Sequence, residues 1–356
     1  MGKIKNNFSI FGDYYAIDSI MKRNLRSPLL LFALFLPLYL CGQENRNTNI
    51  TFDGALKTKL EICPKYGVVR FNVRNSRVGV RGDLGDYMGY RLQIEWSAEG
   101  SFAPLDMYGV LKPIKGLSFQ LGQTSIPFEN SYIITPAEML FANRAFVGKY
   151  FTPGTRDIGV VMSYKYVWND LPLEAQAGMF NGGKINNPQW TEHPSYAFRL
   201  IVGRMDGFRA TAKIYHYQNV VINHLFWGAD LHYATKYFRV EAEVMDRKNI
   251  SIKQHLSGGY VQGAWHYYLK KEGMFRHITP ALRWDTMGYD VWNLGFDVSR
   301  ITAGLHFGLS LKPFESVLRL DYEHYFVRQE AHRLFFEGRD LYAADHKVTL
   351  ELLVKF

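Results

Sequence analysis

The sequence contains very little cysteine and, after residue 42, no long apolar run. Of its 356 residues only 2 are Cys. A membrane-spanning helix needs about 20 consecutive apolar residues, so a helical membrane protein is excluded. The chain also lacks the His-Glu-x-x-His, Cys-x-x-Cys, Gly-x-Ser-x-Gly and phosphate-loop motifs of common enzymes. We therefore expect no catalytic centre, no metal site and no cofactor.

A sustained helical period is missing as well, and alternation of apolar and polar residues takes its place. In the stretch from Tyr90 to Trp96, for example, Arg91, Gln93 and Glu95 alternate with apolar residues. Such stretches are about ten residues long and are separated by Gly, Pro, Asn and Asp. The chain is rich in aromatic residues, at 15%, and many of them lie at the ends of these stretches, as in interfacial girdles. This pattern is typical of a transmembrane β-barrel.

Sixteen alternating segments can be counted, and single-chain bacterial barrels require an even number. Tight turns such as Gly85-Asp86 alternate with longer connections such as 181–195 and 326–346. The sequence thus predicts an all-β fold, a transmembrane antiparallel β-barrel of about 16 strands, with 14 and 18 strands as alternatives. The expected strands are 50–61, 67–82, 88–97, 104–112, 117–126, 157–166, 173–180, 196–204, 208–217, 224–234, 238–247, 257–269, 277–286, 297–311, 316–326 and 347–356.

The first 42 residues differ from the rest of the chain. A basic stretch, 21–26, precedes the apolar stretch 29–40, which is followed by small residues. This order is typical of a cleavable secretory signal. We therefore expect a non-native upstream extension (1–20), a signal peptide (21–42) and an outer-membrane barrel domain (43–356). A re-entrant or buried helix is the alternative for the apolar stretch.

Cleavage before Gln43 would remove Cys41 and leave Cys63 without a partner, so no disulfide is expected. Lipidation of Cys41 is the alternative. Removing residues 1–42 takes away five of the 42 Lys and Arg and two of the 33 Asp and Glu, which leaves 37 against 31, a net charge of +6. This mild excess suits a channel that attracts anions.

The final strand is the most informative single element. Val348, Leu350 and Leu352 share one face with the terminal Phe356. An alternating strand that ends on an aromatic residue resembles the signal read by the outer-membrane barrel insertion machinery, which we expect as a partner. The alternative is an amphipathic edge strand that ends on Phe by chance.

The segment 127–153 has no clean period, and irregular segments of this length are usually functional in a compact domain. In a transmembrane barrel such a loop can fold inward and narrow the channel. The surrounding sequence resembles the ordered signature blocks of the outer-membrane phosphate-selective porin O/P family. The matching blocks are Tyr108-Gly-Val-Leu-Lys-Pro, Gly122-Gln-Thr-Ser-Ile-Pro-Phe-Glu129, Thr155-Arg-Asp-Ile-Gly-Val160, Gly178-Met-Phe-Asn-Gly-Gly183 and, upstream, Arg77-Val-Gly-Val-Arg-Gly82.

The resemblance implies a porin of a Gram-negative outer membrane that lies in lipid and assembles as a homotrimer. It also implies passive diffusion of small anions or polar solutes, phosphate among them, and no role with nucleic acid. Members of the family line their constriction with many arginines, whereas this loop offers Arg144 and Lys149 and carries Glu129 and Glu138. Phosphate selectivity therefore does not follow from the loop.

Transport needs a water-filled lumen and fixed charges. We expect Arg144, Lys149 and Arg156 to bind anions at the constriction, because a guanidinium can engage two oxygens of an anion at once. Each cation could instead be paired with an acidic neighbour. On the polar faces of the strands, the expected lumen-lining cations are Arg91, Arg199, Arg209, Lys213, Arg239, Arg283 and Arg319.

Two other interpretations remain open. The first is an outer-membrane barrel with a plugged lumen that acts as a structural protein or as an enzyme. A Ser/His/acid set could be assembled from Ser163, His306 and Asp321, although nothing in the sequence selects these three. The second is a secreted soluble β-sandwich whose aromatic faces bury one another.

Overall fold

The computed structural model describes residues 48–96, 102–128, 137–152, 154–270, 273–311, 314–337 and 342–356. The predicted upstream extension and signal peptide lie outside these ranges, as do Cys41 and Glu129. Within them, residues 49–356 belong to one compact unit.

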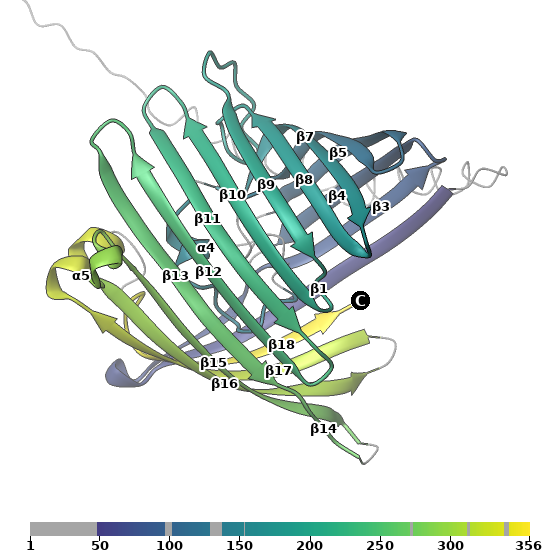
Figure 1. Ribbon diagram of the computed structural model, residues 1–356. Helices are drawn as coiled ribbons and strands as arrows, with labels where there is room; N and C mark the ends of the chain where they lie inside the picture. The colour runs from purple at the N-terminus through teal and green to yellow at the C-terminus, as the bar shows by residue number, and fades with distance from the viewer. Residues whose placement is uncertain are drawn as a thin grey trace, which may run out of the picture. The chain divides into compact units, whose positions relative to one another are not determined.

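Eighteen strands within the described ranges form one antiparallel sheet (Figure 1). Because β1 pairs with β18, the sheet closes into a barrel. The strands are β1 (Thr48–Cys63), β2 (Val68–Val73), β3 (Ser76–Leu84), β4 (Met88–Trp96), β5 (Phe102–Ile114), β6 (Leu117–Ser125), β7 (Arg156–Trp168), β8 (Leu171–Phe180), β9 (Ser195–Gly203), β10 (Phe208–Gln218), β11 (Asn223–Ala234), β12 (Phe238–Asn249), β13 (Gln254–Trp265), β14 (Tyr267–Tyr268), β15 (Phe275–Gly288), β16 (Val298–Leu311), β17 (Phe314–Val327) and β18 (Lys347–Lys355).

Two of the strands that span the barrel are each interrupted by a short break, so the eighteen strands make up sixteen spanning strands. Strands β2 and β3 both pair with β1, and β13 and β14 both pair with β15. Each of these two sets is one strand with a short break, at 74–75 and at His266. The predicted strand number and the predicted antiparallel barrel are therefore confirmed. Every predicted strand boundary lies within three residues of the observed one.

Alternation along each strand separates an outer face from an inner face. In β9, Tyr196, Phe198 and Leu200 are 48%, 46% and 41% exposed, whereas Ala197 and Arg199 between them are 4% and 6% exposed. Apolar side chains that point outward all around a closed sheet are the surface that lipid requires. The polar residues of the same strands therefore turn toward the interior.

Connections at the two ends of the barrel differ in length. At one end the turns are tight; in the β7–β8 turn, Asn169 and Asp170 have φ values of 45° and 65°. Positive φ at both central residues is what a type I′ hairpin turn requires, and Asn and Asp tolerate it. The other end carries longer segments such as 181–194, 289–297 and the connection from β6 to β7.

The last residue closes the barrel seam against the first strand. The backbone of Phe356 exchanges two hydrogen bonds with Gly54, at 2.8 and 3.1 Å. A Cβ at position 54 would lie 2.4 Å from the Phe356 ring, so a larger residue there would displace that ring.

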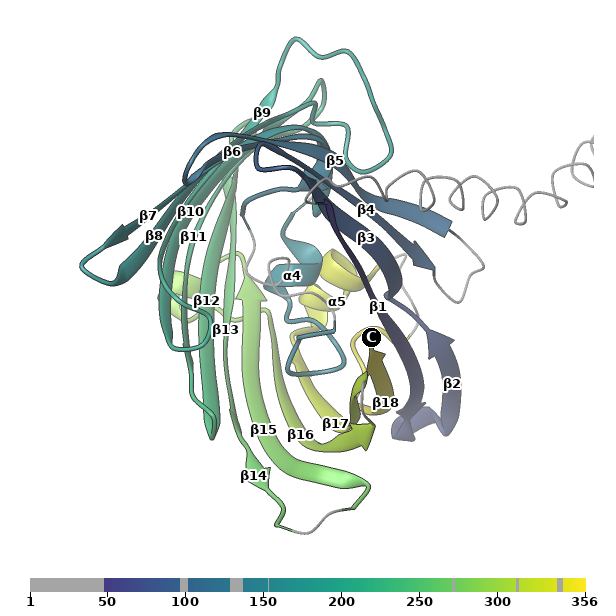
Figure 2. The same cartoon turned by 90° about the vertical axis from the view of Figure 1, so that its right-hand side faces the viewer.

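Two short α-helices lie inside the ring of strands (Figure 2). Helix α4 (Val147–Tyr150) belongs to the β6–β7 connection, and α5 (Gln329–Phe336) belongs to the β17–β18 connection. Two 3-10 turns, η1 (Pro64–Tyr66) and η2 (Val291–Asn293), complete the described elements. None of the described helices is long and apolar enough to cross a membrane.

Candidate functional site

The constriction loop is the connection 126–155 between β6 and β7, and its described parts, 126–128, 137–152 and 154–155, fold into the barrel (Figure 2). Phe128, Phe146 and Phe151 of this loop are each at most 1% exposed. They pack with Phe335 and Phe336 of α5 and with inward aromatic residues of the wall in one apolar cluster. The predicted inward fold of the loop is thus confirmed. The second inward segment, α5, was not predicted.

Basic side chains from the barrel wall donate hydrogen bonds to backbone carbonyl oxygens of the constriction loop. A backbone carbonyl carries no net charge, so these bonds do not neutralise the basic side chains. They fix the course of the loop instead. The bonds are Arg239 Nη1 to Glu138 O at 3.0 Å, Arg319 Nη2 to Met139 O at 2.5 Å, Lys59 Nζ to Ala142 O at 2.9 Å, Arg283 Nη1 to Asn143 O at 2.9 Å, Arg300 Nη2 to Arg144 O at 2.7 Å and Arg247 Nη1 to Phe151 O at 3.2 Å.

Acidic side chains of the same wall accept hydrogen bonds from the loop amides. Asp321 Oδ2 accepts the N–H of Ala142 at 2.8 Å, and Asp285 Oδ2 accepts the N–H of Phe146 at 2.9 Å. Asp285 also binds Arg300, at 3.0 and 2.8 Å. The wall therefore satisfies both donors and acceptors of a loop that has no regular structure of its own here. We call the inward faces of β1 and β12–β18 the clamp wall.

A second group of charges on β10–β12 is paired within itself. Asp230 accepts hydrogen bonds from Arg209 at 2.7 Å and from Lys213 at 2.9 Å, and Lys213 also binds Glu243. The side chains of Arg209, Lys213 and Asp230 are at most 3% exposed. Buried ions of this kind need their partners, because an uncompensated charge would be costly.

The inward faces of β3–β9 border a cavity of about 250 Å³, which we call the arginine cavity. Its lining includes Arg77, Arg91, Arg156 and Arg199, but only one acidic residue, Asp106. The remaining polar lining is uncharged and includes three glutamines, a tyrosine, a threonine and a serine. We call this arc of strands the cavity wall. Its arginines face space, whereas those of the clamp wall contact the loop.

Three of the four cavity arginines have a carboxylate partner. The pairs are Arg77 with Glu95 at 2.6 Å, Arg91 with Asp53 at 2.5 Å and Arg156 with Asp106 at 2.6 Å. Arg199 differs, because Nη2 donates to the amide oxygen of Gln176 at 2.6 Å and no described carboxylate lies within ion-pair distance. Its Nε is buried and has no hydrogen-bond partner among the described residues. The cavity therefore carries one surplus positive charge.

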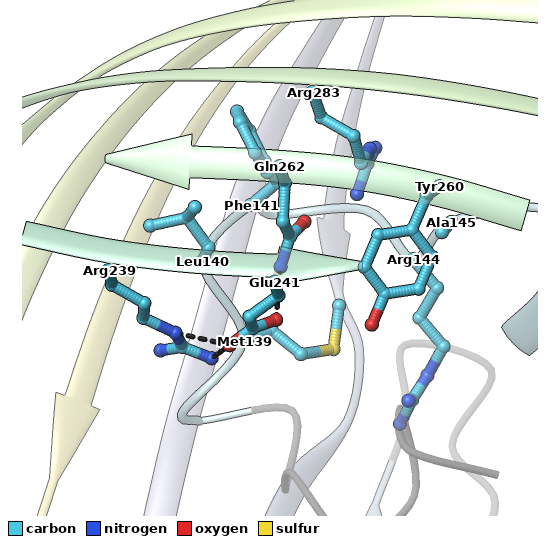
Figure 3. Close-up of a pocket in the computed structure, with 10 residues that line it drawn as sticks. All are labelled: Met139, Leu140, Phe141, Arg144, Ala145, Arg239, Glu241, Tyr260, Gln262 and Arg283. Carbon is cyan, nitrogen blue, oxygen red and sulfur yellow. Dashed lines mark hydrogen bonds and ion pairs between the residues drawn. The ribbon is translucent and has the colours of Figure 1, made fainter. Parts of the chain in front are cut away.

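A smaller cavity of about 30 Å³ lies between the constriction loop and the clamp wall (Figure 3). Arg239 forms an ion pair with Glu241, two residues along the same strand, β12, and Gln262 donates to the same carboxylate at 2.6 Å. Arg144 also lines this space, with its side chain extended away from Arg239 (Figure 3). The space is of the order of a single water, so it offers no path for a solute.

Lys149 of α4 is exposed to water, and its Nζ lies 5.2 Å from the centre of the Tyr150 ring. The surrounding protein lowers the pKa of Lys149 to about 8, first through partial desolvation and then through repulsion by Arg300 and Lys347. Its charge consequently changes near neutral pH, unlike that of an ordinary lysine.

Besides Arg144 and Lys149, the other eight predicted cations fall into three environments. Arg91, Arg156 and Arg199 line the arginine cavity; Arg239, Arg283 and Arg319 contact the constriction loop; Arg209 and Lys213 belong to the buried cluster. Sequence reasoning missed the loop contacts of Lys59, Arg247 and Arg300 and the cavity position of Arg77. All four occupy polar positions of alternating strands, so alternation marks them as inward-facing but does not indicate their partners.

The Ser/His/acid set considered from sequence is not assembled. His306 Nε2 and Asp321 Oδ1 lie 2.8 Å apart, but Ser163 Oγ has no hydrogen-bond partner among the described residues. Asp321 is also occupied by the loop amide of Ala142. Across the described part of the chain, no group of three or more His, Cys, Asp or Glu could hold a metal ion.

No protein-family model and no curated protein matches this chain in sequence. Its backbone, in contrast, is similar to solved outer-membrane proteins over most of its length. An anion-selective porin from Comamonas acidovorans is 13% identical, with a TM-score of 0.62 over 87% of this chain and 99% of that one. The chain has the porin fold.

Two further structures agree with this assignment of the porin fold. Salmonella typhi OmpF, in complex with daunomycin, is 10% identical with a TM-score of 0.61 over 86% of this chain and 97% of that one. The trimer form of OmpT, an outer membrane protein of Vibrio cholerae, is 10% identical with a TM-score of 0.58 over 87% and 99%. With its lipid-compatible outer face, the chain is a β-barrel of the Gram-negative outer-membrane type.

Proposed function

We propose that this porin-fold barrel is a passive diffusion channel for small anionic or polar solutes. The observation that supports this function is the arginine cavity, which has a volume of about 250 Å³ and is lined by four arginines and one acidic residue. Fixed charges of one sign beside a narrow aqueous space select ions of the opposite sign. Arg156 borders this space directly, and Arg144 and Lys149 of the loop would add to its positive potential.

Phosphate is one candidate solute, as the resemblance to the phosphate-selective porin O/P family implies. Arginine suits phosphate because its guanidinium can bind two oxygens. Three of the four cavity arginines are already engaged by carboxylates, however. A general preference for small anions therefore accounts for the cavity better than selectivity for phosphate.

The experiment is to measure the reversal potential of the purified barrel in planar bilayers under a KCl gradient. We expect a potential that marks anion preference, and a smaller one in the Arg144→Ala/Lys149→Ala double variant. Lys115→Gln, in the β5–β6 turn outside the cavity, removes one positive charge and serves as the control. Equal reversal potentials in the wild type and the double variant would show that Arg144 and Lys149 do not contribute to ion selectivity.

A barrel with a plugged lumen is the second candidate, because a specific observation favours it. The apolar cluster joins the constriction loop and α5 to inward side chains of strands from β7 to β17, so it extends across the interior. In that case the protein would have a structural or enzymatic role. Folded protein that inserts into bilayers without forming channels would favour this candidate and would contradict the first.

We also propose that the barrel assembles as a homotrimer and that Phe356 is read by the barrel insertion machinery. The trimer form of the similar Vibrio cholerae protein supports the first point. Light scattering of the detergent-solubilised protein, with the detergent mass subtracted, should give three times the chain mass. A monomeric mass in mild detergent would contradict it.

A further inference from the structure

We propose that Arg199 is the solute-binding residue of the arginine cavity and that its ligands are small hydroxylated monocarboxylates of the sugar-acid type. This inference rests on the proposed channel function. It narrows that function from general anion preference to one residue and one chemical class of solute.

Arg199 is the cavity arginine that forms no ion pair with a described carboxylate; Glu174, Asp230 and Glu243 attract it only from beyond ion-pair distance. Its side chain is 6% exposed, and its only described hydrogen bond is from Nη2 to the neutral amide of Gln176. Glu174, on the same strand as Gln176, accepts a hydrogen bond from Gln176 Nε2 at 2.6 Å and lies 3.8 Å from Lys165 Nζ. A buried guanidinium without a counter-charge is costly. An anion that enters the cavity would relieve this cost at Arg199 and at no paired arginine.

The charge balance selects a monoanion. Three arginine–carboxylate pairs contribute no net charge to the cavity, so Arg199 provides a surplus of one. A carboxylate carries one negative charge and matches the planar guanidinium. A phosphate group carries about 1.5 to 2 negative charges near neutral pH, of which the surplus charge of Arg199 would balance only one.

The uncharged lining selects a hydroxylated solute. Gln93, Gln120, Tyr108, Thr124 and Ser125 border the same cavity as Arg199. Amides and hydroxyls both donate and accept hydrogen bonds, as the hydroxyl groups of a sugar acid do. A volume of about 250 Å³ is slightly below the usual range of about 300 to 1,000 Å³ for sites of drug-sized ligands. A solute the size of a hexonic acid fits these features together.

The test is block of chloride current by gluconate, added to one side of a planar bilayer that holds the wild-type barrel. Acetate supplies the carboxylate without the hydroxyls, sorbitol supplies the hydroxyls without the carboxylate, and inorganic phosphate supplies the competing oxyanion. We expect gluconate to block at a concentration about ten-fold lower than each of the other three, since it alone offers both a single carboxylate to Arg199 and hydroxyl groups to the uncharged lining.

Substitutions then assign the block to one residue. We expect Arg199→Gln to raise the half-blocking gluconate concentration about ten-fold, and Arg199→Lys to raise it less because it keeps the charge but loses the planar fork. Lys115→Gln should leave the block unchanged. A heat-dependent shift in electrophoretic mobility confirms that each variant has folded, and Arg199→Lys decides the question if Arg199→Gln does not fold.

Each contrary result overturns a definite part of the proposal. Unchanged gluconate block in the folded Arg199 variants would show that Arg199 is not the binding residue, without contradicting the channel function. Stronger block by phosphate or acetate than by gluconate would show that sugar acids are not the preferred solutes. A wild-type barrel that forms no channels would overturn the channel function itself, and the inference with it.

Discussion

The clamp wall and the cavity wall carry the same residue type in the same orientation, yet their arginines have different roles. On the clamp wall, Arg283 and Arg300 donate to carbonyl oxygens of the constriction loop. On the cavity wall, Arg91 and Arg199 border about 250 Å³ of open space. The difference lies in what packs opposite each arginine. The proposed role in selectivity therefore applies only to inward-facing arginines that the loop leaves uncovered.

The largest effect is expected from Asp285→Ala on the clamp wall. This change removes the acceptor of the Phe146 amide and one carboxylate partner of Arg300. The buried Arg283 and Arg300 would then share a single carboxylate, that of Glu323. Breaking a buried ion pair on one side costs about 3–5 kcal/mol. We expect lower resistance to urea in detergent and a larger single-channel conductance, because the loop loses an anchor.

The control for this prediction is Asp83→Ala. Asp83 is an exposed carboxylate at the tight-turn end, where Lys112 is its partner. Exposed pairs contribute about 0–1 kcal/mol, so little change is expected. Equal effects of the two substitutions would show that Asp285 does not hold the loop.

Arg283→Gln should separate conductance from selectivity. Its guanidinium binds the carbonyl of Asn143 and lies 4.7 Å from the centre of the Phe141 ring, so it does not face the arginine cavity. A hydrogen bond to a charged group contributes about 1.5–3 kcal/mol. We expect reduced stability and noisier channel openings, with a reversal potential close to that of the wild type. A large change in reversal potential would show that an arginine of the clamp wall also controls ion selectivity, which contradicts the distinction between the two walls.

The same substitution on the cavity wall, Arg91→Gln, should do the opposite. It leaves Asp53 unpaired beside the cavity and lowers the local charge by one. At about 8 Å in water one charge changes the energy of a monovalent ion by about 0.5 kcal/mol, with opposite signs for an anion and a cation. The anion-to-cation permeability ratio should therefore fall about five-fold, for a combined change of about 1 kcal/mol. The Arg91→Gln/Asp53→Asn double variant keeps the net charge and should restore the ratio. Equal ratios in the single and double variants would contradict this account.

The smallest effect concerns pH. The pKa of Lys149 is lowered to about 8, so its ammonium loses a proton as pH rises through 8, while an ordinary lysine stays charged. Anion preference should therefore weaken between pH 7 and pH 9. Because the folded-state pKa lies below the unfolded one, the contribution of Lys149 to stability rises over the interval from pH 8 to 10.5. Lys149→Gln should abolish the pH dependence of the reversal potential. If the pH dependence persists in this variant, another titrating group causes it.

Local patterns in the sequence determined the barrel. Period-two alternation identifies which residues of a strand face lipid, and turn residues such as Asn169 and Asp170 mark where strands reverse. These features act over a few residues, so the number of strands, their boundaries and the inward orientation of the cations could all be predicted. The long segment without a period also indicated the constriction loop.

Only the tertiary structure decided how each inward charge is used. Arg199 and Arg283 occupy equivalent polar positions in their strands, but one borders open space and the other binds Asn143, which is 140 residues away in sequence. The path of the loop and the inward position of α5 follow from packing of Phe146, Tyr150 and Phe336 across the interior. Contacts between segments this far apart leave no periodic trace in the chain, because only closure of the barrel brings them together.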